Sequence, residues 1–128
     1  MRKILRAKIH RATVTHADLH YEGSITLPPE LMSLSGIVTN EAVAVWNINN
    51  GSRFETYAIE GAKNSWDISV NGAAAHLVSP GDLVIIAAFE YLNSKEVSSF
   101  EPKLIFVDQN NRPKELRKEI PGPRKLAG

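Results

Sequence analysis

The distribution of apolar and polar residues predicts a chain made of many short β-strands. Residues 3–15 alternate with a period of two, as expected for a strand with one buried face. The two faces of this segment hold Leu5, Ala7 and Ile9 on one side and Arg6, Lys8 and His10 on the other. Further strands are predicted at residues 42–48, 53–59, 66–70, 83–89 and 103–107.

The predicted strand 53–59 returns from a turn at Asn49-Asn50-Gly51, a strong signal for a hairpin with residues 42–48. Strand alternation divides its side chains into two sets, which are Arg53, Glu55 and Tyr57 on one face and Phe54, Thr56 and Ala58 on the other.

Two short helices interrupt the strands. Residues 28–34 begin with two prolines, which the first turn of a helix tolerates, and Gly36 is suited to end that helix. Residues 94–100 predict a second helix, and residues 73–75 a single helical turn after a break at Asn71-Gly72. Turns are expected at residues 80–82 and 108–111.

Many strands with few helices predict a small closed barrel, because closure removes exposed sheet edges. Periodicity alone does not select the barrel topology. At 128 residues the chain is one domain, residues 1–128, long enough to bury a core without disulfides or a structural metal. From Pro113 onward, charged residues and a Pro-Gly-Pro sequence predict a tail, residues 113–128, that is flexible or loosely docked.

Composition excludes several classes of function. The chain has no cysteine, so it forms no disulfide, thiolate nucleophile or zinc–thiolate site. Its longest apolar run, residues 83–89, is too short to cross a bilayer, and no signal peptide is recognised, so we expect a cytoplasmic protein that does not bind membranes. The formal net charge is +1, with basic residues divided between the two ends and no interleaved aromatic platform. We therefore expect no nucleic-acid partner.

One segment concentrates reactive side chains in front of a Gly-Ser bond. Residues 15–24 read THADLHYEGS, with two histidines, two acids and a tyrosine ahead of Gly23-Ser24. Glycine adds backbone freedom before a hydroxyl that can reach back to the preceding carbonyl. That arrangement suits an N→O acyl shift, in which the serine oxygen attacks the Gly23 carbonyl and converts an amide into an ester. Taken alone, a Gly-Ser pair is also an ordinary turn.

Two further blocks, NGSRFETYAI at residues 50–59 and VNGAAAH at residues 70–76, occur with KIHRA at residues 8–12. In this order and combination, the blocks make the chain resemble the pyruvoyl-dependent aspartate 1-decarboxylases. The resemblance covers residues 3–107.

The resemblance implies a six-stranded double-psi β-barrel with short helices and self-cleavage at Gly23-Ser24. Cleavage would give a β chain, residues 1–23, and an α chain, residues 24–128, that begins with a pyruvoyl group. The implied reaction is decarboxylation of L-aspartate to β-alanine and CO₂ through a Schiff base, which supplies pantothenate biosynthesis. The implied cofactor is this pyruvoyl group, without PLP or metal. The implied assembly is a homotetramer with active sites between subunits.

The resemblance also assigns roles to individual residues. Ser24 becomes the pyruvoyl group, Tyr57 protonates the carbanion, and Thr56 binds the Gly23 carbonyl during processing. A phenol is protonated at neutral pH, which suits an acid, and Arg and Lys suit the two carboxylates of aspartate. Substrate binding is implied for Lys8, Arg53, Thr56, Asn71, Gly72, Ala73 and Ala74, processing for Gly23, Ser24, Thr56 and Asn71, and a secondary role near the pocket for His10 and Tyr21.

Alternative readings belong to other classes. A serine hydrolase that uses Ser24 with a nearby histidine would leave the chain whole, but the chain lacks a G-x-S-x-G elbow. A barrel without catalytic activity could bind a partner through its basic ends. His16, His20 and His76 lack the spacing of a metal site. The sequence leaves open whether maturation needs a helper protein, and which of Lys8 and Arg53 binds which carboxylate.

Overall fold

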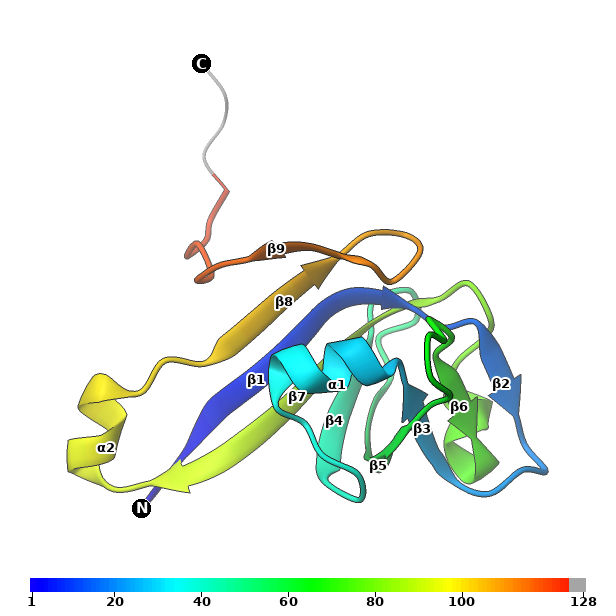
Figure 1. Cartoon of the computed structure of the whole chain (residues 1–128), viewed down its shortest axis with the longest axis horizontal. Helices are drawn as coiled ribbons and strands as arrows, with labels where there is room; N and C mark the ends of the chain where they lie inside the picture. The colour runs from blue at the N-terminus through cyan, green and yellow to red at the C-terminus, as the bar shows by residue number, and fades with distance from the viewer. Residues whose placement is uncertain (125–128) are drawn as a thin grey trace.

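The structure, a computed structural model, describes residues 1–124, which are built mainly from β-strands (Figure 1). These are β1 Arg2–Thr13, β2 His16–Asp18, β3 Ser24–Leu27, β4 Ala42–Asn47, β5 Arg53–Glu60, β6 Ser69–Asn71, β7 Leu83–Leu92, β8 Lys103–Val107 and β9 Pro113–Leu116. Hydrogen bonds join them in the order β2-β6-β3-β5-β4-β7-β1-β8-β9. Pairs β1–β8, β2–β6 and β3–β5 are parallel, and the remaining pairs are antiparallel.

Strand β1 runs through the middle of the molecule between β7 and β8. Its alternation is as predicted, since Ala7 and Ile9 are fully buried while Lys8 and His10 are partly exposed. A bulge at Arg11, whose φ is +64°, shifts the register so that Ala12 also enters the core. The N-terminal part of β1 and the C-terminal part of β7 extend as an arm that ends near helix α2, Ser94–Ser99 (Figure 1).

The predicted helices are confirmed with small changes of bounds. Helix α1, Pro29–Ser35, buries Leu31 and Met32 and ends at Gly36, whose φ of +76° closes the last turn. Asn93 caps α2 by accepting backbone hydrogen bonds, while Glu96 returns a side-chain contact to Asn93. The helical turn expected at residues 73–75 is a 3₁₀ helix, η1, Gly72–Leu77.

The prediction of a strand at residues 66–70 is wrong for residues 66–68. The Thr15 side chain accepts a hydrogen bond from the Ile68 N–H over 3.0 Å, replacing a strand partner there. Pairing therefore starts at Ser69, in the three-residue strand β6. Strands β2 and β3, which have three and four residues, were not predicted because segments this short do not establish a period.

The C-terminal segment begins more regularly than expected. Residues 113–116 form β9, which pairs antiparallel with β8. Residues 117–124 follow without a further strand, and the last four residues of the predicted tail lie outside the described residues.

Asn111 fastens the turn between β8 and β9 to the barrel. It is 1% exposed, and its amide nitrogen donates to the carbonyls of Thr13 and Trp66 over 3.0 and 3.1 Å. Its side-chain oxygen accepts from the Thr13 N–H over 2.7 Å. The Asn111 side chain thus links the end of β1, the 66–68 segment and the β8–β9 turn beside the apolar core.

Candidate active site

Ser24 is the most unusual residue in the described chain. It opens β3, is 2% exposed and has a φ of +145°, which residues with a side chain rarely adopt. Its hydroxyl oxygen is buried and makes no hydrogen bond within residues 1–124. The conformation costs on the order of 1–3 kcal/mol, and an unpaired buried hydroxyl costs about as much again.

The antiparallel pairing of β3 with β6 sets Ser24 directly opposite Asn71. Asn71 is 5% exposed, and its side-chain oxygen accepts a hydrogen bond from the Ser69 hydroxyl over 2.8 Å. Gly72 follows, with a φ of +68°. A Cβ atom at Gly72 would lie 2.9 Å from the Gly23 Cα, so the absence of a side chain lets the two backbones approach.

Gly23 itself has room for a side chain, since an added Cβ meets nothing within 4 Å. The unusual backbone is therefore at Ser24, and the close approach is made by Gly72. This differs from the expectation that Gly23 supplies the freedom at this bond.

The parallel pairing of β3 with β5 brings the second predicted pair of residues alongside. Ile25 lies level with Ala58. Gly23 and Ser24 precede Ile25 in the chain, as Thr56 and Tyr57 precede Ala58 on β5. Thr56 is partly buried and Tyr57 is 42% exposed, so the two residues face opposite sides of β5, as predicted. The hydrogen bonds among residues 1–124 do not include one from the Thr56 hydroxyl to Gly23.

A hollow of about 570 Å³ lies beside this junction and is bordered by Tyr21 and Asn71. The Tyr21 side chain is 63% exposed. Ala73 and Ala74 continue from Gly72 into η1, the former exposed and the latter packed partly against the core. The small residues 72–74 leave the backbone accessible next to Asn71.

The two predicted carboxylate-binding residues lie on other strands. The Arg53 guanidinium carbon sits 4.5 Å from the centre of the Trp46 ring. Lys8 forms an ion pair with Glu119 in the C-terminal segment, at 3.4 Å between Nζ and Oε2. In the sheet, Lys8 pairs with Ala87 of β7. Ala87 pairs in turn with a residue of β4, and that residue pairs with one of β5.

His10 lies next to Lys8 on the same face of β1. Burial, followed by the charges of Lys8 and Arg11, lowers the pKa of His10 below its usual value. Its ring Nδ1 is buried without a hydrogen-bond partner in residues 1–124, and the ring meets Phe106 edge-on with centroids 5.2 Å apart. A neutral imidazole is favoured in this group of cations.

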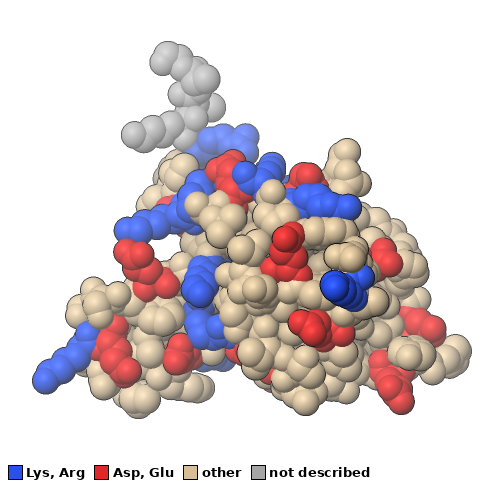
Figure 2. All heavy atoms as spheres, viewed as in Figure 1, with Lys and Arg blue, Asp and Glu red and all other residues tan. Residues whose placement is uncertain are grey.

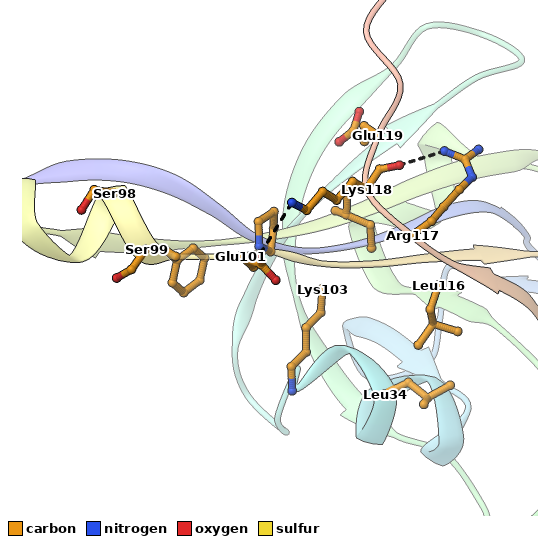
Figure 3. Close-up of a pocket in the computed structure, with 12 residues that line it drawn as sticks. Leu34, Ser98, Ser99, Glu101, Lys103, Leu116, Arg117, Lys118 and Glu119 are labelled. Carbon is orange, nitrogen blue, oxygen red and sulfur yellow. Dashed lines mark hydrogen bonds and ion pairs between the residues drawn. The ribbon is translucent and has the colours of Figure 1, made fainter.

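A larger hollow, about 850 Å³, lies elsewhere, between α1, the end of α2 and β9 (Figure 3). Charged side chains surround it, and Lys118 forms an ion pair with Glu101 across its edge (Figure 3). None of the predicted site residues lines it. Figure 2 shows basic side chains gathered near the C-terminal segment, with acidic side chains among them.

Across residues 1–124, no three His, Cys, Asp or Glu side chains are grouped so that they could hold a metal ion. The same part of the chain contains no helix that is long and apolar enough to cross a membrane.

Comparison with known proteins identifies the family. A family model described as aspartate decarboxylase matches residues 1–114. The chain belongs to the aspartate decarboxylase family. The fold is the double-psi β-barrel of this family, and the predicted carboxy-lyase class is confirmed. The nine-strand order neither supports nor contradicts the predicted count of six barrel strands.

Curated relatives carry the same description. A protein of Legionella pneumophila (strain Paris) named aspartate 1-decarboxylase is 62% identical over 118 residues, covering 92% of this chain and 89% of the relative. A protein of the same name from Myxococcus xanthus is 56% identical, with 98% of each chain covered. One from Rhodopirellula baltica is 54% identical, covering 95% of this chain and 78% of the relative.

Within this family member, one chain brings together Gly23, Ser24, Asn71 and Gly72, with Thr56 and Tyr57 on the adjacent strand. Lys8 does not border the hollow beside them and instead forms an ion pair with Glu119. Sequence reasoning missed Trp46 and Glu119, the partners of Arg53 and Lys8. The predicted hairpin pairing offered a signal for Trp46, whereas nothing in the sequence indicated the contact of Glu119.

Gly72→Ala should destabilise the fold by about 2–4 kcal/mol, because the methyl group adds a clash with Gly23 to an unfavourable φ. Gly51→Ala is a matched control, since Gly51 has a φ of +77° but open space around its Cβ position. It should cost about 1 kcal/mol. Urea denaturation measures both, and equal losses would mean that the contact with Gly23 does not constrain the fold.

Proposed function

We propose that the chain cleaves itself between Gly23 and Ser24 and then decarboxylates L-aspartate to β-alanine and CO₂. The observation that carries this proposal is Ser24, a buried hydroxyl without a partner on a strained backbone immediately after Gly23. A serine with only a structural role would satisfy its hydroxyl, as Ser35 does by donating to the Met32 carbonyl over 3.3 Å.

Cleavage begins when the Ser24 oxygen attacks the Gly23 carbonyl carbon. The C–N bond breaks, an ester forms, and the freed amine stays on Ser24. Loss of the Cα proton of Ser24 expels the Gly23 carboxylate and leaves dehydroalanine. Water then replaces the nitrogen, ammonia departs, and a pyruvoyl group remains at the start of residues 24–128. Strain of about 1–3 kcal/mol favours the first step but does not drive it alone.

Polar groups must also stabilise the negative oxygen that forms at Gly23 in the first step. The family resemblance assigns this role to the Thr56 hydroxyl, and the register of β5 beside β3 supports it. Asn71, opposite Ser24, is suited to hold the attacking residue in place. Because the Ser24 oxygen has no hydrogen-bond partner, a pyruvoyl group formed from Ser24 would break no existing contact there.

Ser24→Ala should give a folded chain that stays whole, because a methyl group cannot attack Gly23. The matched control is Ser35→Ala at a second fully buried serine, which should still cleave. Intact-mass measurement of the purified proteins is the test. Two fragments divided at 23/24 from the Ser24→Ala chain would reject the proposal, and an unaltered chain that stays whole with hydrolase activity would favour the serine hydrolase.

Once formed, the pyruvoyl group supplies a carbonyl that condenses with the substrate amine and accepts the electrons released with CO₂. The chain's own residues bind and orient aspartate. Arg53 and Lys8 offer positive charge to its two carboxylates. The small residues Gly72, Ala73 and Ala74 allow the substrate to approach beside Asn71. β-Alanine is the product that would supply pantothenate biosynthesis.

Tyr57 is the proposed acid that protonates the carbanion after CO₂ has left. It precedes Ala58, the residue of β5 that pairs with Ile25 next to Ser24, and its side chain is 42% exposed. The phenol O–H is a proton donor.

Tyr57→Phe keeps the ring and removes only this proton donor. The variant should cleave normally, while turnover of aspartate falls by about 10²–10⁴-fold. The measurement is β-alanine production after mass spectrometry has confirmed the pyruvoyl group. Unchanged turnover in the fully processed variant would assign protonation to water or another residue.

The active enzyme is proposed to be a homotetramer whose sites lie between subunits. Lys8 is not among the residues of the same chain that border the hollow beside Asn71 and Tyr21. Lys8 also faces outward, toward Glu119. A Lys8 that acts on substrate at Ser24 is therefore proposed to come from a neighbouring copy.

Co-expression of Lys8→Ala and Ser24→Ala chains tests this arrangement. Each variant alone should lack turnover, whereas mixed assemblies should recover up to about a quarter of the sites if Lys8 and Ser24 act from different subunits. If the two residues act within one chain, the mixture stays inactive. Cleavage of the Lys8→Ala chain by itself, without any other protein, would also mean that no maturation factor is required.

A further inference from the structure

Three arginines stack on aromatic rings in the described chain, and one of them differs from the others. Arg112 lies 4.2 Å from the Trp66 ring centre and donates to the Asn110 carbonyl. Arg117 lies 3.9 Å from the Phe106 ring centre and pairs with Glu115. These two guanidinium groups use their N–H donors within the chain.

Arg53 stacks on Trp46 at 4.5 Å but makes no hydrogen bond or ion pair within residues 1–124. Glu55, two residues along the same face of β5, is not paired with it. The guanidinium lies over the Trp46 ring, and its N–H groups stay open for a planar partner such as a carboxylate.

Trp46 is itself held firmly. It is directly opposite Arg53 in the β4–β5 pairing and pairs with Ile85 of β7 on its other side. Its ring packs against Phe89 with centroids 6.4 Å apart, and the Lys3 ammonium lies 4.9 Å from the Phe89 ring centre. The ladder of Arg53, Trp46, Phe89 and Lys3 thus crosses four strands that lie next to one another in the sheet.

From this geometry we infer that Trp46 is a positioning residue for substrate binding, which holds the Arg53 guanidinium so that its donor edge faces the aspartate carboxylate. The inference rests on the proposed function of Arg53. A long arginine side chain loses rotamer freedom when it binds a carboxylate, and prior stacking on a fixed ring reduces that loss. Because the ring does not touch the reacting atoms, its effect falls on binding.

The test compares Trp46→Leu, which removes the aromatic face, with Trp46→Phe, which keeps a smaller one. In fully cleaved enzyme, Trp46→Leu should raise KM for aspartate about three- to tenfold while kcat changes less than about twofold. Trp46→Phe should restore most of the difference. Trp66→Leu, which removes the equivalent stack under Arg112, should leave both constants unchanged.

A double-mutant cycle separates this inference from the proposed function. If Trp46 acts through Arg53, Trp46→Leu should add nothing to the higher KM of Arg53→Ala. Equal additional increases in both backgrounds would overturn the positioning role while leaving Arg53 as a substrate-binding residue. An unchanged KM in Arg53→Ala would overturn the role of Arg53 and the inference with it.

A readout without substrate completes the test. The Arg53 Hε proton, assigned by its loss in Arg53→Lys, should be shifted upfield by the indole ring in NMR spectra of the uncleaved Ser24→Ala chain. Trp46→Leu in that background should return it to the ordinary range. An Hε shift that does not respond to Trp46→Leu would overturn the inference even if KM changes.

Discussion

The pairing of Ser24 with Asn71 is the constraint around which this barrel is arranged. It holds a residue with a side chain at a φ of +145° inside the protein, where relaxation would require moving β3 away from both neighbouring strands. Gly72 makes the pairing possible because it has no Cβ, an atom that would lie 2.9 Å from the Gly23 Cα. The apolar core holds the strands in place, with Ile25 and Val70 fully buried next to the pair. The fold thereby sustains a local conformation that is unfavourable by itself.

The inside and the outside of the barrel carry different parts of the proposed chemistry. Backbone strain and desolvation act at the start of β3, at the peptide bond where cleavage is proposed. The outer face of β5, β4, β7 and β1 presents positive charge through Arg53 and Lys8, each held by a different contact. Because Lys8 shares its ammonium with Glu119, a substrate carboxylate at that position would have to displace the acid of the C-terminal segment. Arg53 has no such competitor within residues 1–124.

Much of the fold followed from alternation in the sequence. The long strand β1 and the hairpin of β4 and β5 were predicted closely because each strand has one apolar face, and β8 because it is a continuous apolar run. Strands β2 and β3 were missed, since three or four residues are too few to establish a period. The error at residues 66–68 has a different source, because a threonine side chain remote in sequence takes the place of a strand neighbour. The motifs indicated Ser24, Asn71 and Tyr57, but the strain at Ser24 depends on pairing that local sequence does not encode.

The position of the proposed cut also bears on how the mature protein would respond to unfolding. A break at 23/24 leaves residues 1–23 as a separate peptide that contributes β1, at the centre of the sheet between β7 and β8, and β2 beside β6. In the intact precursor these strands find their partners within one chain. After the break the same sheet is a complex of two peptides, so its reassembly depends on concentration and competes with aggregation of the exposed core. The uncut precursor would thus be able to refold as a single chain, whereas the cleaved enzyme would not.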